Sequence, residues 1–395
     1  MDQTPDITGA VSKEWLDSLL SRAIESRASD IHLEPARDAF HIRYRIDGLL
    51  YLIENLSMER HEPVVSRVKV VSQLDITEHR IPQDGHFEFT YGGLGGMRFF
   101  NIRVSTFPTI YGEAIVMRIL NREDILINLE GLGFDQSQLN TVENLIVQPY
   151  GMVLITGPSG SGKTTLLYSI LNALNKQTVN IITIEDPVEL NLEGAHQTQI
   201  SEETGLTFAK ALRAVLRQDP DIMMVGEIRD SDSAQISMQA ALTGRLVFSS
   251  FHTLNVFAVV ARLLEMGVPR SIIANAIVGV IASRLVRKIC NSCKTSYQPT
   301  PAETKMLGVY LETQKLLIGK GCDECRHSGY KGRVGIYEVV SFDEEIRTAI
   351  IEEASSSKLL SIIRGKKIKS LKEGAVDKVF EGITSIQEVV RVIGK

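Results

Sequence analysis

MVLITGPSGSGKT, residues Met152–Thr164, is the stretch of sequence that decides the fold. Its last eight residues match G-x-x-x-x-G-K-[ST], between the short apolar strand Met152–Thr156 and the helix-like run Thr165–Leu174. The glycines let backbone N–H groups crowd a triphosphate, and the helix offers the anion its positive end. The pattern therefore predicts that the chain binds a nucleoside triphosphate. The residues expected to hold it are Gly157, Pro158, Ser159, Gly160, Ser161, Gly162, Lys163, Thr164 and Thr165.

Two of these side chains have separate tasks. Lys163 is expected to reach the β- and γ-phosphates as a point charge, and the Thr164 hydroxyl can bind Mg²⁺. Both come directly after the last glycine of the loop. ATP and Mg²⁺ are therefore the predicted ligands, with adenine inferred only from the family resemblance described below.

Composition limits the class of protein. A length of 395 residues suggests two or three domains, and a formal net charge of −5 argues against affinity for nucleic acid over the whole surface. Met1–Ala10 has no apolar core and does not resemble an export signal. The longest apolar run, Ile272–Ala282, is shorter than the ~18–20 residues of a membrane span. We expect a cytoplasmic protein that associates with a membrane only through partners.

Residues 1–120 are predicted to form a small α+β domain. Apolar residues at helical spacing indicate a helix over 11–24, and Phe40–Ile46 alternates as a half-buried strand does. A further helix and three strands are expected at Pro63–Leu74, Phe87–Tyr91, Arg98–Ser105 and Glu113–Leu120. The last two strands are joined by a short loop, so Arg103 and Arg118 should be neighbours.

A connector over 121–134 leads to the predicted nucleotide-binding core, residues 135–283. Short apolar strands alternate there with helical patterns, which indicates a mostly parallel sheet. These strands are Met152–Thr156, Asn180–Ile184, Ile222–Val225 and Leu246–Ser249. Residues 284–335 are more polar and hold every cysteine, and 336–395 are expected to form a helical tail.

Polar residues follow three of these strands, where an open α/β sheet binds its ligand. They are Glu185, Glu227 and His252. Glu227 is predicted to orient the attacking water and Glu185 to coordinate Mg²⁺ indirectly, although the residues permit the reverse assignment. His252 is a candidate sensor of the γ-phosphate. For each acidic residue alone, a solvated loop position is the alternative interpretation, and for His252 it is a purely structural role.

All four cysteines form two C-x-x-C pairs, Cys290 with Cys293 and Cys322 with Cys325. Four thiolates at this spacing are typical of a closed structural Zn²⁺ site, in which the metal has no open position for catalysis. Disulfide pairing is the alternative, and a cytoplasmic location disfavours it.

The chain resembles the secretion ATPase superfamily, in particular the type II secretion and type IV pilus assembly ATPases. The resemblance spans nearly the whole chain. It rests on the P-loop, the cysteine pairs and on ASDIHLEP (28–35), RYRIDGL (43–49), RVST (103–106), TIEDPVE (183–189), LRQDPD (216–221), GEIRD (226–230) and GYKGRVGIYE (329–338).

This resemblance implies an α/β fold with a RecA-like P-loop NTPase domain, preceded by a small PAS-like α+β domain. It also implies a homohexameric ring that drives pilin assembly together with inner-membrane platform and docking proteins. Arg103 and Arg118 would act as arginine fingers on the phosphates when the domains close. Without the resemblance, a surface ion pair would be the expected role of each arginine.

Two features depart from the family pattern. Arg245 stands where the family usually has a histidine after Thr243–Gly244, and it could meet phosphate or slow hydrolysis. Assembly ATPases usually carry an additional N-terminal docking domain, whereas this sequence opens on the helix that contains Trp15. Either a segment has been removed or the protein recruits its partner through another surface.

Two alternative functions remain on the sequence alone. A nucleic-acid motor could use the same core, but the single Trp and an aromatic content of 6% provide few stacking residues. A regulatory scaffold that binds nucleotide without hydrolysing it would accommodate Arg245.

Overall fold

The computed structural model describes residues 12–93, 96–121, 126–201, 203–308, 315–354 and 356–394. The chain divides into two compact units, Met1–Arg122 and Glu123–Lys395. The segment Met1–Ala10, which was predicted not to be an export signal, lies outside the described residues. So do positions 122–125 of the predicted connector.

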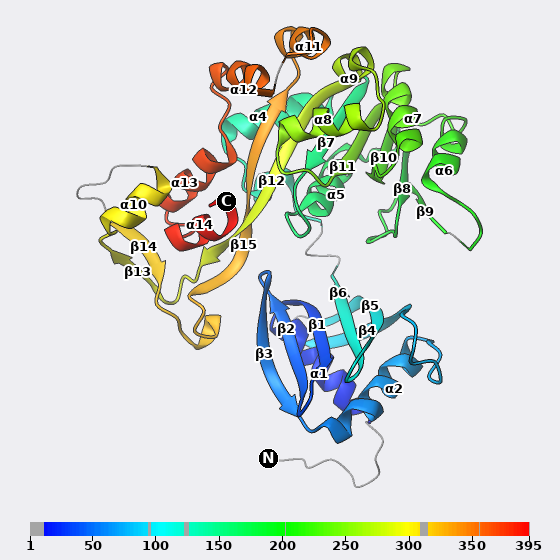
Figure 1. Cartoon of the computed structure of the whole chain (residues 1–395), viewed down its shortest axis with the longest axis vertical. Helices are drawn as coiled ribbons and strands as arrows, with labels where there is room; N and C mark the ends of the chain where they lie inside the picture. The colour runs from blue at the N-terminus through cyan, green and yellow to red at the C-terminus, as the bar shows by residue number, and fades with distance from the viewer. Residues whose placement is uncertain are drawn as a thin grey trace. The chain divides into compact units, whose positions relative to one another are not determined.

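The first unit is an antiparallel sheet with two helices packed on one face (Figure 1). The strand order is β3-β2-β1-β6-β5-β4, and the predicted alternation of Phe40–Ile46 places Phe40, Ile42 and Tyr44 in the core. The elements are α1 (Lys13–Glu25), β1 (Ala28–Pro35), β2 (Phe40–Ile46), β3 (Leu49–Leu56), η1 (Met58–Arg60), α2 (His61–Val71), β4 (Gln83–Gly93), β5 (Gly96–Thr109) and β6 (Gly112–Leu120).

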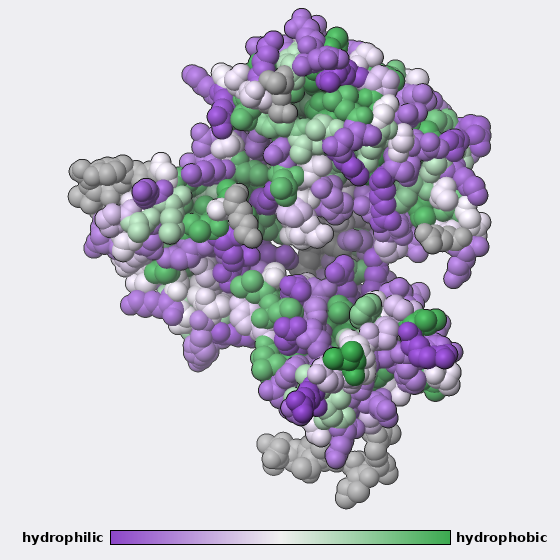
Figure 2. Space-filling view, in the orientation of Figure 1, coloured by the Kyte–Doolittle hydropathy of each residue, from purple (hydrophilic) through white to green (hydrophobic). Residues whose placement is uncertain are grey.

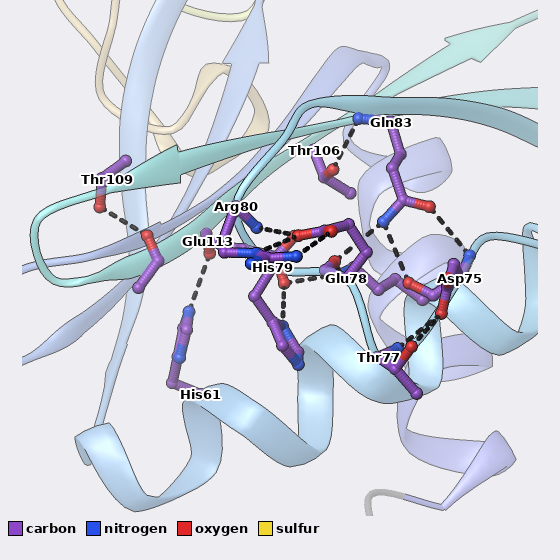
Figure 3. Close-up of polar contacts among 12 residues, drawn as sticks. His61, Asp75, Thr77, Glu78, His79, Arg80, Gln83, Thr106, Thr109 and Glu113 are labelled. Atoms are coloured by element: carbon purple, nitrogen blue, oxygen red, sulfur yellow. Dashed lines mark hydrogen bonds and ion pairs between the residues drawn. The ribbon is translucent and has the colours of Figure 1, made fainter.

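A buried ion pair fixes the segment that joins α2 to β4. Lys69, which is fully buried, donates to Glu113 Oε2 at 2.7 Å and to the backbone oxygen of Glu78 at 2.6 Å. His79 Nδ1 lies 2.6 Å from the same Glu113 oxygen, and His61 Nε2 lies 2.8 Å from the Glu113 backbone oxygen (Figure 3). A buried charge needs such partners, so the network neutralises Lys69 and holds the segment on the sheet.

Arg103 and Arg118 lie directly opposite each other on β5 and β6, which confirms that they are neighbours. Arg118 also lies opposite Asp30 of β1, and its Nε donates to Asp30 Oδ1 at 2.8 Å. Arg45 Nε is 3.6 Å from Asp30 Oδ2. The Asp30 carboxylate therefore pairs with the guanidinium groups of Arg118 and Arg45. The ion pair is what a surface arginine is expected to make, and the finger role stays a prediction.

The second unit is built on a seven-stranded sheet of order β15-β12-β7-β11-β10-β8-β9. All neighbouring strands are parallel except β12 and β15, which confirms the predicted mostly parallel sheet. The strands of the sheet are β7 (Gly151–Thr156), β8 (Ile181–Glu185), β9 (His196–Gln199), β10 (Ile222–Glu227), β11 (Leu246–Phe251), β12 (Ile277–Ile289) and β15 (Tyr330–Ser341).

Helices cover both faces of this sheet, and strand residues on both faces are therefore buried. One face packs against η2 (Leu129–Leu132), α4 (Gln136–Ile146) and α5 (Lys163–Leu174). The other face packs against α6 (Phe208–Val215), α7 (Ser231–Leu242), α8 (Val256–Glu265), α9 (Arg270–Ala276), α11 (Glu344–Ile351) and α12 (Ser356–Gly365).

The long strands β12 and β15 extend beyond the sheet core toward the cysteines (Figure 1). The cysteine-containing segment was predicted to cover residues 284–335. β12 crosses the first of these borders and β15 crosses the second. A separate apolar cluster packs around this extension. The remaining elements are β13 (Lys294–Tyr297), α10 (Pro301–Leu307), β14 (Leu316–Gly319), η3 (Asp323–Cys325), α13 (Leu371–Phe380) and α14 (Ile386–Ile393).

The visible surface of both units is mostly hydrophilic, with apolar residues in small groups (Figure 2). Among the residues that the structure describes, no helix has the length and apolar character needed to span a bilayer.

Candidate functional site

The P-loop lies at the carboxyl end of β7, between that strand and α5. Gly162 precedes the helix in the left-handed region, with φ 91°, which favours glycine. A Cβ on Gly157 would lie 2.7 Å from the backbone oxygen of Ser283, so β12 leaves no room for a side chain there. The loop is therefore shaped by backbone geometry that only glycine tolerates at these two positions.

Lys163 is the first residue of α5 and is buried against the loop. Its Nζ donates to the backbone oxygens of Gly157 at 2.8 Å and Pro158 at 3.2 Å. Burial lowers the pKa of Lys163 to about 8, although the nearby Glu227 carboxylate opposes this shift. The ammonium is thus held within the loop, and a bound anion would favour its charged form.

His252 connects Lys163 to Glu227. Its Nδ1 lies 3.5 Å from Lys163 Nζ, and its Nε2 lies 3.3 Å from Glu227 Oε2. Because an ammonium only donates, Nδ1 is the acceptor in this arrangement, which leaves the proton of a neutral imidazole on Nε2. Three of the predicted site residues, from the ends of different elements, are therefore brought together.

Arg229 holds the other oxygen of Glu227. Its Nε donates to Glu227 Oε1 at 2.7 Å, and a second guanidinium nitrogen contacts the same oxygen. The guanidinium also donates to Asp186 Oδ2 at 3.0 Å. These carboxylates, with Glu227 the largest contributor, raise the pKa of Arg229. Sequence reasoning did not select Arg229, although it lies within the GEIRD motif.

Glu185 lies at the end of β8 but points into the protein interior, with 4% of its surface exposed. Its carboxylate accepts hydrogen bonds from Tyr168, Thr183 and Gln197. The structure thus places Glu185 against α5, the helix that begins at Lys163. Its predicted contribution to Mg²⁺ binding stays a prediction.

β12 also contributes to the edge of the loop, which the sequence did not indicate. Ser283 Oγ lies 3.2 Å from Ser161 Oγ. The neighbouring Arg284 donates to the backbone oxygens of Ser283 and Leu254, at 2.8 Å each. Burial lowers the pKa of Arg284, whose charge also contributes to the lowered pKa of Lys163. The only signal for Arg284 in the sequence was its place just after the apolar run Ile272–Ala282.

Arg245 lies at the opposite edge of the sheet from the P-loop. It precedes β11, and its backbone oxygen accepts from Gly151, the first residue of β7. Its guanidinium donates to Thr243, at 2.8 Å to the backbone oxygen. The P-loop follows the carboxyl end of β7, which has 6 residues. At ~3.3 Å per residue, the two ends of this strand are roughly 20 Å apart. Arg245 therefore cannot meet a phosphate held by the P-loop of its own chain.

The four cysteines converge in one cluster, as the spacing predicted. Their ligand atoms all lie within 4.8 Å of one another, and the hydrogen-bonded sulfur pairs are 3.7–3.9 Å apart. A tetrahedral ion with Zn–S bonds of about 2.3 Å requires sulfur separations of about 3.8 Å. Backbone N–H groups of Gly321, Cys322 and Gly329 point at the sulfurs of Cys293 and Cys325. The donor set therefore fits a structural metal.

A parallel sheet with a P-loop after one strand and a carboxylate and a histidine after neighbouring strands defines a P-loop NTPase of the RecA-like class. Residues 8–391 match the family described as "Type II/IV secretion system protein", and the chain belongs to this family. It is an ATP-hydrolysing enzyme.

Curated relatives are similar over nearly the whole of this chain. Type II secretion system protein E of Pseudomonas aeruginosa is 42% identical over 99% of this chain and 78% of its own length. Type II secretion system ATPase E of Vibrio cholerae is 42% identical over 95% of this chain and 74% of its own. The type IV pilus assembly ATPase PilB of Thermus thermophilus is 41% identical over 98% of this chain, but only 43% of its own length.

Solved structures show the same fold. The Legionella pneumophila ATPase DotB superposes with a TM-score of 0.70 at 23% identity, over 98% of this chain and 96% of its own. The pilus retraction motor PilT with bound ADP gives 0.63 at 25% identity, over 95% of this chain and 96% of its own. The predicted fold class and the predicted family are thus confirmed.

Proposed function

We propose that this chain is a Mg²⁺-dependent ATPase that works as a homohexamer and powers pilin or pseudopilin assembly in a type II secretion or type IV pilus system. The observation that carries the proposal is the chain of contacts from Lys163 through His252 to Glu227 at the P-loop. The relatives named for these two systems support the choice of machinery.

In the proposed reaction, the P-loop and Lys163 hold the β- and γ-phosphates. Glu227 orients a water whose oxygen attacks the γ-phosphorus while the bond to the β–γ bridging oxygen breaks and ADP leaves. Glu227 Oε2 contacts only His252 among the described side chains, so it retains lone pairs for this water. His252 would sense the γ-phosphate because it contacts both Lys163 and Glu227.

Mg²⁺ fits the residues on α5 and β8, because a threonine hydroxyl and a carboxylate are oxygen ligands. Thr164 would hold the ion directly and Glu185 through water. The ion would neutralise charge on the phosphates. Arg103 and Arg118 are proposed to supply further positive charge as arginine fingers.

We propose inner-membrane platform and docking proteins as partners, a cytoplasmic location at the inner membrane through those partners alone, and no nucleic-acid substrate. The family assignment supports this proposal.

Purified protein with ATP and Mg²⁺ should release phosphate over many turnovers, at a rate that rises as rings assemble. Phosphate release would be followed with and without single-stranded DNA, and ring size by native mass measurement. Release that stops at one phosphate per chain would favour the scaffold alternative. Strong stimulation by DNA would favour the nucleic-acid motor.

Zinc is proposed as the metal held by the four cysteines. Purified protein should contain about one zinc per chain, because four thiolates at this spacing form a closed tetrahedral site. Cys290→Ser should lose the metal and lower the unfolding temperature, because binding energy at structural zinc sites is folding energy. Ser292→Ala, between the first two cysteines, is the matched control and should retain zinc. Metal-free protein that unfolds at the same temperature would contradict the assignment.

A further inference from the structure

The Glu185 carboxylate is held by donors from three different elements. Tyr168 of α5 donates to Oε2 at 2.6 Å, and Thr183 of β8 donates to Oε1 at 2.6 Å. Gln197 of β9 donates to Oε1 at 3.1 Å. Both carboxylate oxygens are therefore fixed in position by side chains.

These donors replace the water that burial removes from the carboxylate. Glu185 is 4% exposed, and Tyr168 and Thr183 are fully buried. A buried carboxylate keeps its charge only when hydrogen bonds replace the lost water. Burial, together with the adjacent Glu185 charge, raises the pKa of Tyr168, so its hydroxyl remains a donor at any physiological pH.

The position of Tyr168 on α5 relates this carboxylate to the P-loop. Tyr168 follows Thr164 by four residues on the same helix, so the two side chains lie on one face about one turn, or ~5.4 Å, apart. Thr164 is the proposed ligand of Mg²⁺. Tyr168 thus connects the Glu185 carboxylate to the helix that carries Thr164.

We propose that Tyr168 and Thr183 are positioning residues that hold the Glu185 carboxylate toward the water shell of the nucleotide-bound Mg²⁺. The proposal rests on the proposed role of Glu185. Phenylalanine at position 168 would keep the ring in the core but release Oε2. The carboxylate could then rotate, and its attraction for the hydrated ion would weaken.

A structural role for the hydroxyl must be separated from this one. Tyr168 also accepts from the backbone N–H of Leu190 and from Gln197, at 3.4 Å each, so it also contacts the segment after β8. Loss of that contact alone would lower stability without changing the metal dependence. A readout of metal affinity distinguishes the two roles.

The test uses the full chain with a non-hydrolysable ATP analogue, and Mn²⁺ binding followed by electron paramagnetic resonance. Tyr168→Phe and Thr183→Val should each weaken Mn²⁺ binding by about 10- to 100-fold, the usual effect of removing a group that orients a metal ligand. Analogue binding in EDTA should be unchanged. Tyr337→Phe is the matched control. Tyr337 lies in the same apolar cluster as Tyr168 and donates to the backbone oxygen of Leu132 at 3.4 Å. Loss of the Tyr337 hydroxyl should leave Mn²⁺ affinity unchanged.

Glu185→Gln separates the failure of this proposal from failure of the underlying assignment. If Glu185→Gln leaves Mn²⁺ affinity unchanged, Glu185 does not serve the metal. If Glu185→Gln weakens Mn²⁺ binding but Tyr168→Phe does not, Tyr168 is structural and the positioning role is overturned. Should Tyr168→Phe fail to fold, Thr183→Val decides the matter through the other oxygen: unchanged Mn²⁺ affinity in that variant overturns the proposal.

Discussion

Glu227→Gln is expected to reduce the steady-state rate of ATP hydrolysis by roughly 10²- to 10⁴-fold, the usual contribution of a positioned carboxylate that handles the proton of an attacking water. The amide keeps the shape of the side chain but cannot accept that proton. Nucleotide affinity should stay close to that of the natural protein, because Lys163 keeps its contacts with the loop carbonyls. Phosphate release and binding of a fluorescent ATP analogue would be measured in parallel.

The matched control for this variant is Glu265→Gln. Glu265 is an exposed glutamate of the same unit whose carboxylate pairs with Arg262 at 3.0 Å, and its substitution should leave hydrolysis unchanged. Hydrolysis at the natural rate in Glu227→Gln would show that Glu227 does not orient the attacking water. Glu185 would then be the candidate for that role. Loss of nucleotide binding would show instead that Glu227 mainly neutralises the charges around it.

The parallel strands of the second unit could be predicted because their signals are local. Short apolar runs followed by polar residues locate β7, β8, β10 and β11 within one or two residues. The same logic placed Lys163, Glu227 and His252 at one edge of the sheet, where the structure links them. For such residues, a position at the carboxyl end of a parallel strand is sufficient to predict that they lie near the ligand site.

Strands with weaker patterns were missed. β1 was covered only by the motif ASDIHLEP, and β3 was not predicted, because it is half-exposed along most of its length and lacks a clean alternation. β9 is a short, polar edge strand that periodicity does not reveal. These strands form because a neighbour offers hydrogen bonds, and this cannot be inferred from their own residues.

The partners of the site residues could not be predicted for the same reason. Tyr168 and Glu185 are 17 residues apart, and Arg284 reaches the carbonyl of Leu254 across 30 residues. Arg245 illustrates the converse, because its place at the position of the family's usual histidine suggested a phosphate contact or slower hydrolysis. Arg245 precedes the amino end of β11, however, so it lies at the opposite end of the strands from the P-loop.

Lys163→Met is expected to weaken binding of an ATP analogue by roughly 10- to 100-fold, because a hydrogen bond to a charged group contributes about 1.5–3 kcal/mol. Hydrolysis should fall at least as far, since the ammonium is also proposed to contact the γ-phosphate. Lys210→Met is the matched control. Lys210 likewise donates to a glycine carbonyl, Gly205 at 2.7 Å, but its side chain is exposed on α6, so its loss should not change affinity.

The pH dependence of binding tests whether Lys163 is the group responsible. Without nucleotide its pKa is lowered to about 8, chiefly by burial, and bound phosphate must raise it because an anion favours the ammonium. Binding therefore takes up a proton above pH 8. Affinity should be constant below that pH and fall by up to about tenfold per unit above it. Lys163→Met should abolish this decline, and a variant that retains the full slope would assign the titration to another group.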